Sequence, residues 1–175
     1  MFHKPQIFIL ILGLFVSPLA PLPTLAATLV NERLSNVILA SARSMVDDEK
    51  FNEADELLTQ ALLADPANAP AFALKGFVQS QLDNPDEALR LMDIALAIEP
   101  DNLQAVFWAG QAATKLENLE EAEKRLARLK TLCGECEQVS FLLADIDVLK
   151  AQETTPKEAK PVSEKLEENG ESEKE

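Results

Sequence analysis

Apolar residues recur through the middle of the chain at intervals of three and four, which is the period of an amphipathic helix. The spacing predicts one helix over residues 69–82 and a second over residues 86–99, which ends at Pro100. Asn84 and the Pro-Asp-Glu sequence after it are typical of a helix start, because asparagine caps free N–H groups and proline fits the first helical position. Asn118 opens the same kind of start one period later. The pattern therefore predicts a helix–turn–helix unit.

The unit repeats every 34 residues. Three series of residues return at this interval: Glu53, Glu87 and Glu121; Ala54, Ala88 and Ala122; and Ala42, Gly76 and Gly110. Pro66 and Pro100 end successive units, and Gly134 takes the corresponding place in the third. A fixed period of this length indicates stacked helical units, which present binding surfaces. We expect units over residues 35–68, 69–102 and 103–136.

This spacing resembles the tetratricopeptide repeat, which has a bulky residue at position 4, small residues at 8 and 20, a large apolar one at 24, alanine at 27 and proline at 32. The middle unit supplies these as Phe72, Gly76, Ala88, Met92, Ala95 and Pro100. The first supplies Ile38, Ala42, Ala54, Leu58, Ala61 and Pro66, and the third supplies Val106, Gly110, Ala122, Leu126, Leu129 and Gly134. The resemblance implies an all-α, right-handed helical solenoid.

Two departures from the family pattern stand out. Glu49, Asp83 and Glu117 occupy the turn position where glycine is usual, so we expect looser turns. Lys75 stands where leucine is common, and we expect Leu74 beside it to serve the core.

The segment after the third unit predicts a cap helix over residues 137–150. Its apolar residues form one stripe at helical spacing, made of Val139, Leu142, Leu143, Ile146 and Leu149. We interpret the helix as a solvating end of the stack. Residues 151–175 are rich in Glu, Lys, Ser and Pro, which predicts a disordered acidic tail.

Residues 1–26 have the features of a cleavable export signal: a basic start, an apolar run over residues 7–16, and small residues before Ala27. A membrane anchor is the alternative, but a hydrocarbon core about 30 Å thick needs roughly 20 apolar residues. We expect cleavage after Ala26 or Ala27, a repeat domain over residues 27–150, and no stable membrane insertion afterwards. By analogy we expect the periplasm.

Composition narrows the possible chemistry. The formal net charge of −14 disfavours nucleic acid as a partner and also fits simple solubility. His3 is the only histidine and lies in the predicted signal, which argues against His-based catalysis and His-containing zinc sites. We therefore expect no enzyme activity, no cofactor and no metal.

The resemblance places the first helix of each unit on a concave face. The candidate partner-binding residues on that face are Leu39, Arg43, Phe77, Phe107, Gln111 and Lys115. Phe77 and Phe107 suit apolar anchors for a bound segment, and packing between units is the alternative role for both. The lysine–asparagine–arginine clamp with which some relatives hold a C-terminal carboxylate is absent, since Leu39, Phe77 and Trp108 replace polar or basic residues. We interpret Trp108 as a core residue.

The only two cysteines, Cys133 and Cys136, lie three apart. In an exported chain this spacing predicts a structural disulfide. A redox pair of the thioredoxin type is the alternative, although that motif follows a strand and none is predicted here. A zinc site would need two further ligands.

These observations together predict an exported interaction or scaffolding module that binds an extended or helical segment of another envelope protein. A thiol–disulfide redox partner acting through Cys133 and Cys136 is one alternative. An assembly subunit that multimerises through its solenoid ends is another.

Overall fold

The computed structural model describes residues 25–154, and the side chains of residues 29–152. This part of the chain is entirely helical apart from short turns, as predicted. Seven helices follow in order: α1 (Leu25–Asp47), α2 (Phe51–Ala64), α3 (Ala69–Gln81), α4 (Pro85–Ile98), α5 (Leu103–Lys115), α6 (Leu119–Cys133) and α7 (Glu137–Thr154). Within residues 25–154, no helix is long and apolar enough to span a bilayer.

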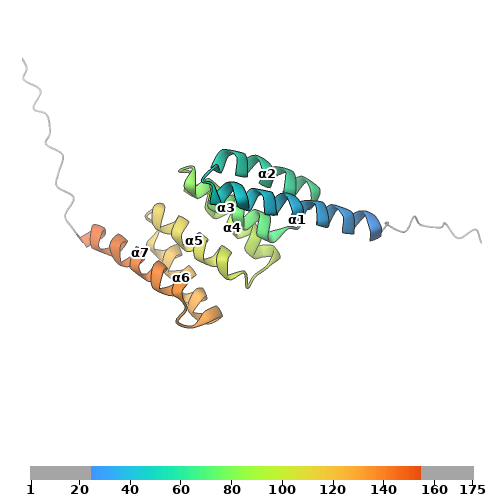
Figure 1. The fold of residues 1–175 in the computed structure, drawn as a ribbon. Helices are drawn as coiled ribbons and strands as arrows, with labels where there is room; N and C mark the ends of the chain where they lie inside the picture. The colour runs from blue at the N-terminus through green and yellow to red at the C-terminus, as the bar shows by residue number, and fades with distance from the viewer. Residues whose placement is uncertain (1–24, 155–175) are drawn as a thin grey trace, which may run out of the picture.

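The helices form pairs that stack into one solenoid, with α1 and α7 at opposite ends (Figure 1). Each pair contributes fully buried residues to a continuous core, among them Leu58, Met92, Leu129 and Leu142. The even-numbered helices pack against the odd-numbered helix that follows them as well as the one before. The core thus runs between the units, which is what a repeat needs because one unit cannot bury its own apolar face.

Small residues at position 8 of the units allow the close packing that the pattern predicts. A Cβ atom on Gly76 would lie 2.8 Å from Met92 Cγ and 2.9 Å from the Ala88 carbonyl oxygen. A Cβ atom on Gly110 would overlap Leu142 Cδ2. Gly76 therefore fits α3 against α4, and Gly110 fits α5 against α7.

The turns within the units correct one expectation. Glu49, Asp83 and Glu117 adopt left-handed backbone, with φ of 59°, 62° and 54°. Each turn is closed by a bond back to its helix; for example, Asn84 N donates to the Gln79 carbonyl oxygen at 2.9 Å. The turns are therefore not looser for lack of glycine. The residues take the conformation that glycine would have taken.

Asparagine caps begin three of the helices. Asn68, Asn102 and Asn118 accept bonds from the backbone N–H groups of Ala71, Ala105 and Glu121 at 3.0, 3.0 and 3.1 Å. Asn84 was expected to cap α4, but its side chain makes no such bond and donates to Gln79 Oε1 at 3.1 Å instead.

Asn68 also joins the first two units. Its amide group donates to Ser35 Oγ at 2.8 Å, and Ser35 in turn donates to the Ala61 carbonyl oxygen at 2.8 Å. Beside this junction, Leu74 is buried as expected, and the Lys75 ammonium donates to Asp55 Oδ1 at 2.5 Å.

The ends of the described region differ from the predicted boundaries. α1 begins at Leu25, inside the segment 1–26, and the rest of that predicted signal lies outside the described residues. α7 runs to Thr154, four residues past the predicted end of the cap helix, and the remainder of the predicted tail lies outside the described residues. Four of the five predicted stripe residues on α7 are buried, but Leu143 is 40% exposed.

Candidate functional site

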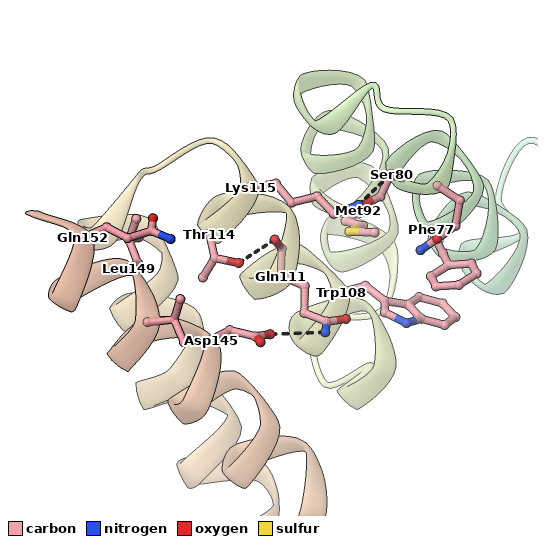
Figure 2. A pocket seen from close by; sticks show the side chains of 12 residues that line it. Phe77, Ser80, Met92, Trp108, Gln111, Thr114, Lys115, Asp145, Leu149 and Gln152 are labelled. Carbon is pink, nitrogen blue, oxygen red and sulfur yellow. Dashed lines mark hydrogen bonds between the residues drawn. The ribbon is translucent and has the colours of Figure 1, made fainter. Parts of the chain in front are cut away.

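A cleft of about 380 Å³ opens on the face formed by α3, α5 and α7 (Figure 2). These are the first helices of successive units, so the repeat itself brings their side chains together. The lining residues are Phe77, Ser80, Gln81, Met92, Trp108, Gln111, Thr114, Lys115, Asp145, Val148, Leu149 and Gln152.

An aromatic pair forms one wall of the cleft. The ring centroids of Phe77 on α3 and Trp108 on α5 lie 4.8 Å apart, and the ring planes are tilted by 32°. Both side chains are half-buried, so part of each ring faces the cleft (Figure 2). Trp108 was interpreted as a core residue, and it does pack against all three apolar clusters of the core. It is nevertheless a lining residue too.

Polar bonds hold the rest of the wall in place. Gln111 Nε2 donates to Asp145 Oδ2 at 3.3 Å, which ties α5 to α7. Lys115 Nζ donates to the Ser80 carbonyl oxygen at 2.6 Å, which ties α5 to α3. Both bonds are visible in Figure 2. The cleft thus combines an apolar platform with amide, ammonium and carboxylate groups at fixed positions, a combination suited to holding a peptide segment.

The structure brings three of the six predicted binding residues to this cleft: Phe77, Gln111 and Lys115. Leu39 and Phe107 are buried in the core, with Phe107 only 9% exposed, so the expectation that they line an open groove is corrected. The physical reason is that the next unit covers this position of each first helix. Arg43 is exposed on α1 and is not among the lining residues.

Sequence reasoning missed the contribution of α7. Asp145, Val148 and Gln152 line the cleft, yet residues 137–150 were interpreted only as a cap. A signal was available, because Asp145 lies 34 residues after Gln111 and the two side chains are hydrogen-bonded. α7 therefore acts as the first helix of a fourth unit, which has no second helix within residues 25–154.

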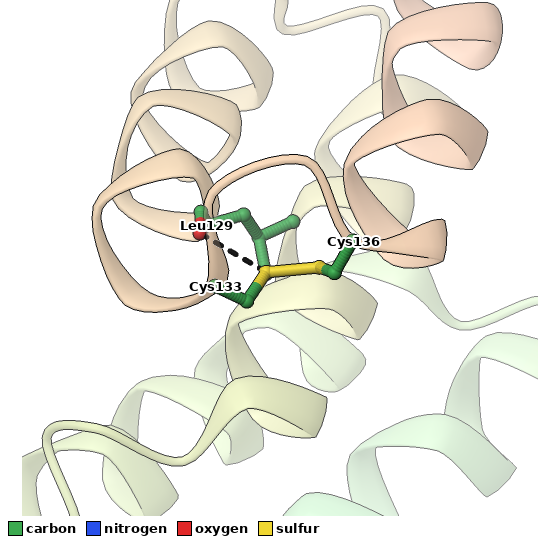
Figure 3. Close-up of a disulfide and its surroundings, with 3 residues drawn as sticks. All are labelled: Leu129, Cys133 and Cys136. Carbon is green, nitrogen blue, oxygen red and sulfur yellow. Dashed lines mark hydrogen bonds between the residues drawn. A yellow bond between two sulfur atoms is a disulfide. The ribbon is translucent and has the colours of Figure 1, made fainter.

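The two cysteines lie at the junction of α6 and α7 (Figure 3). Cys133 and Cys136 are joined in the structure by a disulfide with an S–S distance of 2.07 Å. Gly134 between them has φ of 68° and ends α6. The pair sits between two helices, with no strand anywhere in residues 25–154. In the same range no group of three or more His, Cys, Asp or Glu side chains is placed to hold a metal ion.

Comparison with protein families gives a match to the tetratricopeptide repeat over residues 81–146. The rice Protein SGT1 homolog is 30% identical over 125 residues, which cover 65% of this chain and 34% of that protein. The Arabidopsis thaliana TPR repeat-containing thioredoxin TDX is 29% identical over 100 residues, which cover 57% of this chain and 26% of that protein. This chain thus spans about a third or less of these relatives' length.

Solved structures give the same architecture. The first TPR of Spaghetti (RPAP3), bound to the HSP90 peptide SRMEEVD, superposes with a TM-score of 0.65 at 22% identity, over 69% of this chain and 95% of that one. The Arabidopsis OM64 TPR domain gives 0.64 at 19% identity, over 67% and 98%. The Yersinia enterocolitica chaperone SycD, in complex with a peptide of the translocator YopD, gives 0.60 at 14%, over 67% and 93%. The fold is that of the tetratricopeptide helical solenoid, which confirms the predicted class.

Proposed function

We propose that this chain is an exported tetratricopeptide repeat protein that binds a segment of another envelope protein in the cleft between α3, α5 and α7. The observation that carries the proposal is the open aromatic pair, Phe77 and Trp108, at the wall of that cleft. Half-exposed aromatic rings are typical anchors at protein interfaces. Peptide complexes among proteins of the same fold, such as those of RPAP3 and SycD, support this type of function.

The ligand we infer differs from the acidic HSP90 peptide bound by RPAP3. Phe77 and Trp108 stand at positions where relatives with a carboxylate clamp carry polar or basic residues, and the chain has a formal net charge of −14. Both features disfavour an acidic C-terminus. We expect an apolar side chain of the ligand on the aromatic pair, with the ligand backbone bonded by Gln111 and Lys115.

Residues 1–26 support export, because their basic start, short apolar run and small residues follow the order of a secretory signal. The periplasm or its equivalent is the compartment we propose. In that setting the module acts by binding and not by catalysis, and its partner is a protein and not a nucleic acid, a metal or a membrane.

The redox alternative rests on Cys133 and Cys136 alone. Their position on a turn between two helices differs from the strand-to-helix position of a thioredoxin motif. We therefore assign the disulfide a structural role at the point where α7, which lines the cleft, joins α6.

The test is affinity capture from the envelope fraction, followed by a binding measurement with the captured protein. Phe77→Ala and Trp108→Ala are compared with Leu63→Ala, which removes an exposed apolar side chain outside the cleft. We expect the two cleft variants to bind roughly thirtyfold more weakly, since a hot-spot residue contributes about 2 kcal/mol. Equal binding by all three variants would show that the cleft is not the binding site.

A further inference from the structure

Within the described residues, the solenoid ends on an uncovered stacking face. In complete units, positions 5, 8 and 12 of the first helix are buried or half-buried by the second helix of the same unit and by the following unit; Gly76, for example, faces Met92 on α4, and Gly110 faces Leu142 on α7. The residues at these positions are Leu39, Ala42 and Val46 on α1, Ala73, Gly76 and Ser80 on α3, and Phe107, Gly110 and Thr114 on α5. The equivalents on α7 are Phe141, Ala144 and Val148, and all three are exposed, Phe141 by 53% and Val148 by 59%.

The opposite end of the solenoid shows the complementary face. On α3, α5 and α7, the side chains at positions 3, 6 and 10 contact the preceding unit. On α7 these residues are Val139, Leu142 and Ile146, all buried. On α1, which has no unit before it in the structure, the equivalents are Val37, Ala40 and Ser44, and all three are exposed, Val37 by 65%.

The two open faces are therefore the two halves of one interface. The chain already makes that interface three times: between α1 and α3, between α3 and α5, and between α5 and α7. Its register is fixed by contacts one period apart, such as the bond from Gln111 to Asp145, both at position 9.

Extending this register to a second copy gives complementary charges and volumes. Position 9 of α1 is Arg43, which would lie beside Asp145 of the first copy. Arg43 is exposed and makes no ion pair within the described residues. Ala40 would lie on Ala144, where inside the chain the large Leu142 lies on Gly110. The pair of alanines at the proposed junction and the leucine–glycine pair inside the chain both allow close packing.

We propose that copies of this chain stack head to tail, with α1 of one copy against α7 of the next, and that the 34-residue repeat continues across the junction. The two surfaces differ, so the contact is head to tail; because each unit is displaced along the axis of the solenoid, the contact does not close into a ring and the assembly is an open row. The junction lacks a second helix between α7 and the incoming α1, so it buries less than the junctions inside the chain. We therefore expect weak, concentration-dependent association. This inference does not depend on the proposed function.

The test is sedimentation of the purified chain, in the form that cells produce, over a wide range of concentration. The wild-type mass should rise steadily with concentration, without stopping at a dimer. Val37→Asp and Arg43→Asp should each weaken association by about tenfold or more, because Arg43→Asp places a carboxylate beside Asp145 and Val37→Asp places one against the apolar part of the α7 face. Both residues are exposed and outside the cleft, so these variants should fold and leave the binding of a short peptide in the cleft unchanged.

A charge exchange gives the sharpest result. Asp145→Arg alone should also weaken association, and mixing it with Arg43→Asp should restore association as a row in which the two variants alternate, since both junctions between the two variants then have opposite charges. Circular dichroism checks that Asp145→Arg is folded. If it is not, the proposal is tested with Val37→Asp and Arg43→Asp alone. A wild-type chain that stays monomeric up to high concentration would overturn the proposal. Association that is unaffected by Val37→Asp and Arg43→Asp would also overturn it, and would indicate pairing through α7 alone.

Discussion

Phe77 and Phe107 look equivalent in the sequence, but the structure predicts opposite consequences for their replacement by alanine. Phe107 is 9% exposed and lies in the apolar cluster that includes Val106, Leu142 and Ile146. Removing its ring leaves a cavity between α5 and α7, and buried Phe→Ala changes cost about 3–5 kcal/mol. A domain of ordinary stability has about 5–15 kcal/mol in total. The melting temperature of Phe107→Ala should therefore fall by about 10 °C or more.

Phe77 is half-buried, and its ring meets Trp108 at the edge of the cleft. Phe77→Ala loses an aromatic contact of about 0.5–1.5 kcal/mol and part of its apolar burial, but it widens an open cleft and leaves no closed cavity. We expect a cost of about 1–2 kcal/mol. Trp108 is the only tryptophan in the chain, so its fluorescence reports directly on the loss of the neighbouring ring.

The assay is urea unfolding followed by far-UV circular dichroism, with native-state fluorescence on the same samples. The expected result is a large loss of stability for Phe107→Ala, and a small loss with red-shifted tryptophan emission for Phe77→Ala. Leu63→Ala on the exposed side of α2 serves as the control for apolar truncation. Equal unfolding free energies for the two phenylalanine variants would refute the assignment of one ring to the core and the other to the cleft.

Three further predictions concern the ends and the pH dependence of the domain. Changing both Cys133 and Cys136 to serine should lower the melting temperature by only a few degrees, because closing so short a loop contributes roughly 2 kcal/mol at most; a lost reductase activity would instead favour the redox alternative. Intact-mass analysis should give an N-terminus at Ala27 or Thr28, and a retained Met1 would contradict export. Burial raises the pKa of Glu121, but hydrogen bonds from Lys124 and Arg125 outweigh it and hold that pKa below 4.5. Its ionised form therefore contributes stability that is lost as pH falls through the folded pKa, so the melting temperature of Glu121→Gln should fall less steeply than wild type below about pH 4.5.

The fold could be predicted because the size of the side chain at each repeated position follows from how closely the helices pack there. Gly76 and Gly110 stand where a Cβ atom would overlap a neighbouring helix, so small residues at this fixed interval predict the close contact. The turns were harder to predict. A left-handed residue other than glycine costs roughly 1–2 kcal/mol, which suggests a loose turn, but the packed helices on either side hold Asp83 in place.

The cleft could be predicted only in part, because burial in a stack depends on the following unit. Phe107 and Gln111 lie one turn apart on α5, yet α7 covers the first and leaves the second at the cleft. Periodicity places both on the same side of the helix and does not say how far the next helix reaches. Once residues 137–150 were interpreted as a cap, Asp145 and Val148 could not be assigned to the wall.

The cleft and the stacking faces share position 12 of the repeat, since Ser80, Thr114 and Val148 also line the cleft, and this overlap bears on how the two proposals combine. Ligand contacts come from Phe77, Gln111 and Lys115, while Val37 and Phe141 lie outside the cleft. Asp145 also belongs to both, because it is bonded to Gln111 and would face Arg43 of a second copy. A row of stacked copies would therefore continue the groove from one molecule into the next at Asp145. A ligand long enough to cross that junction would bind more tightly as the row grows, whereas a short peptide would bind each copy independently.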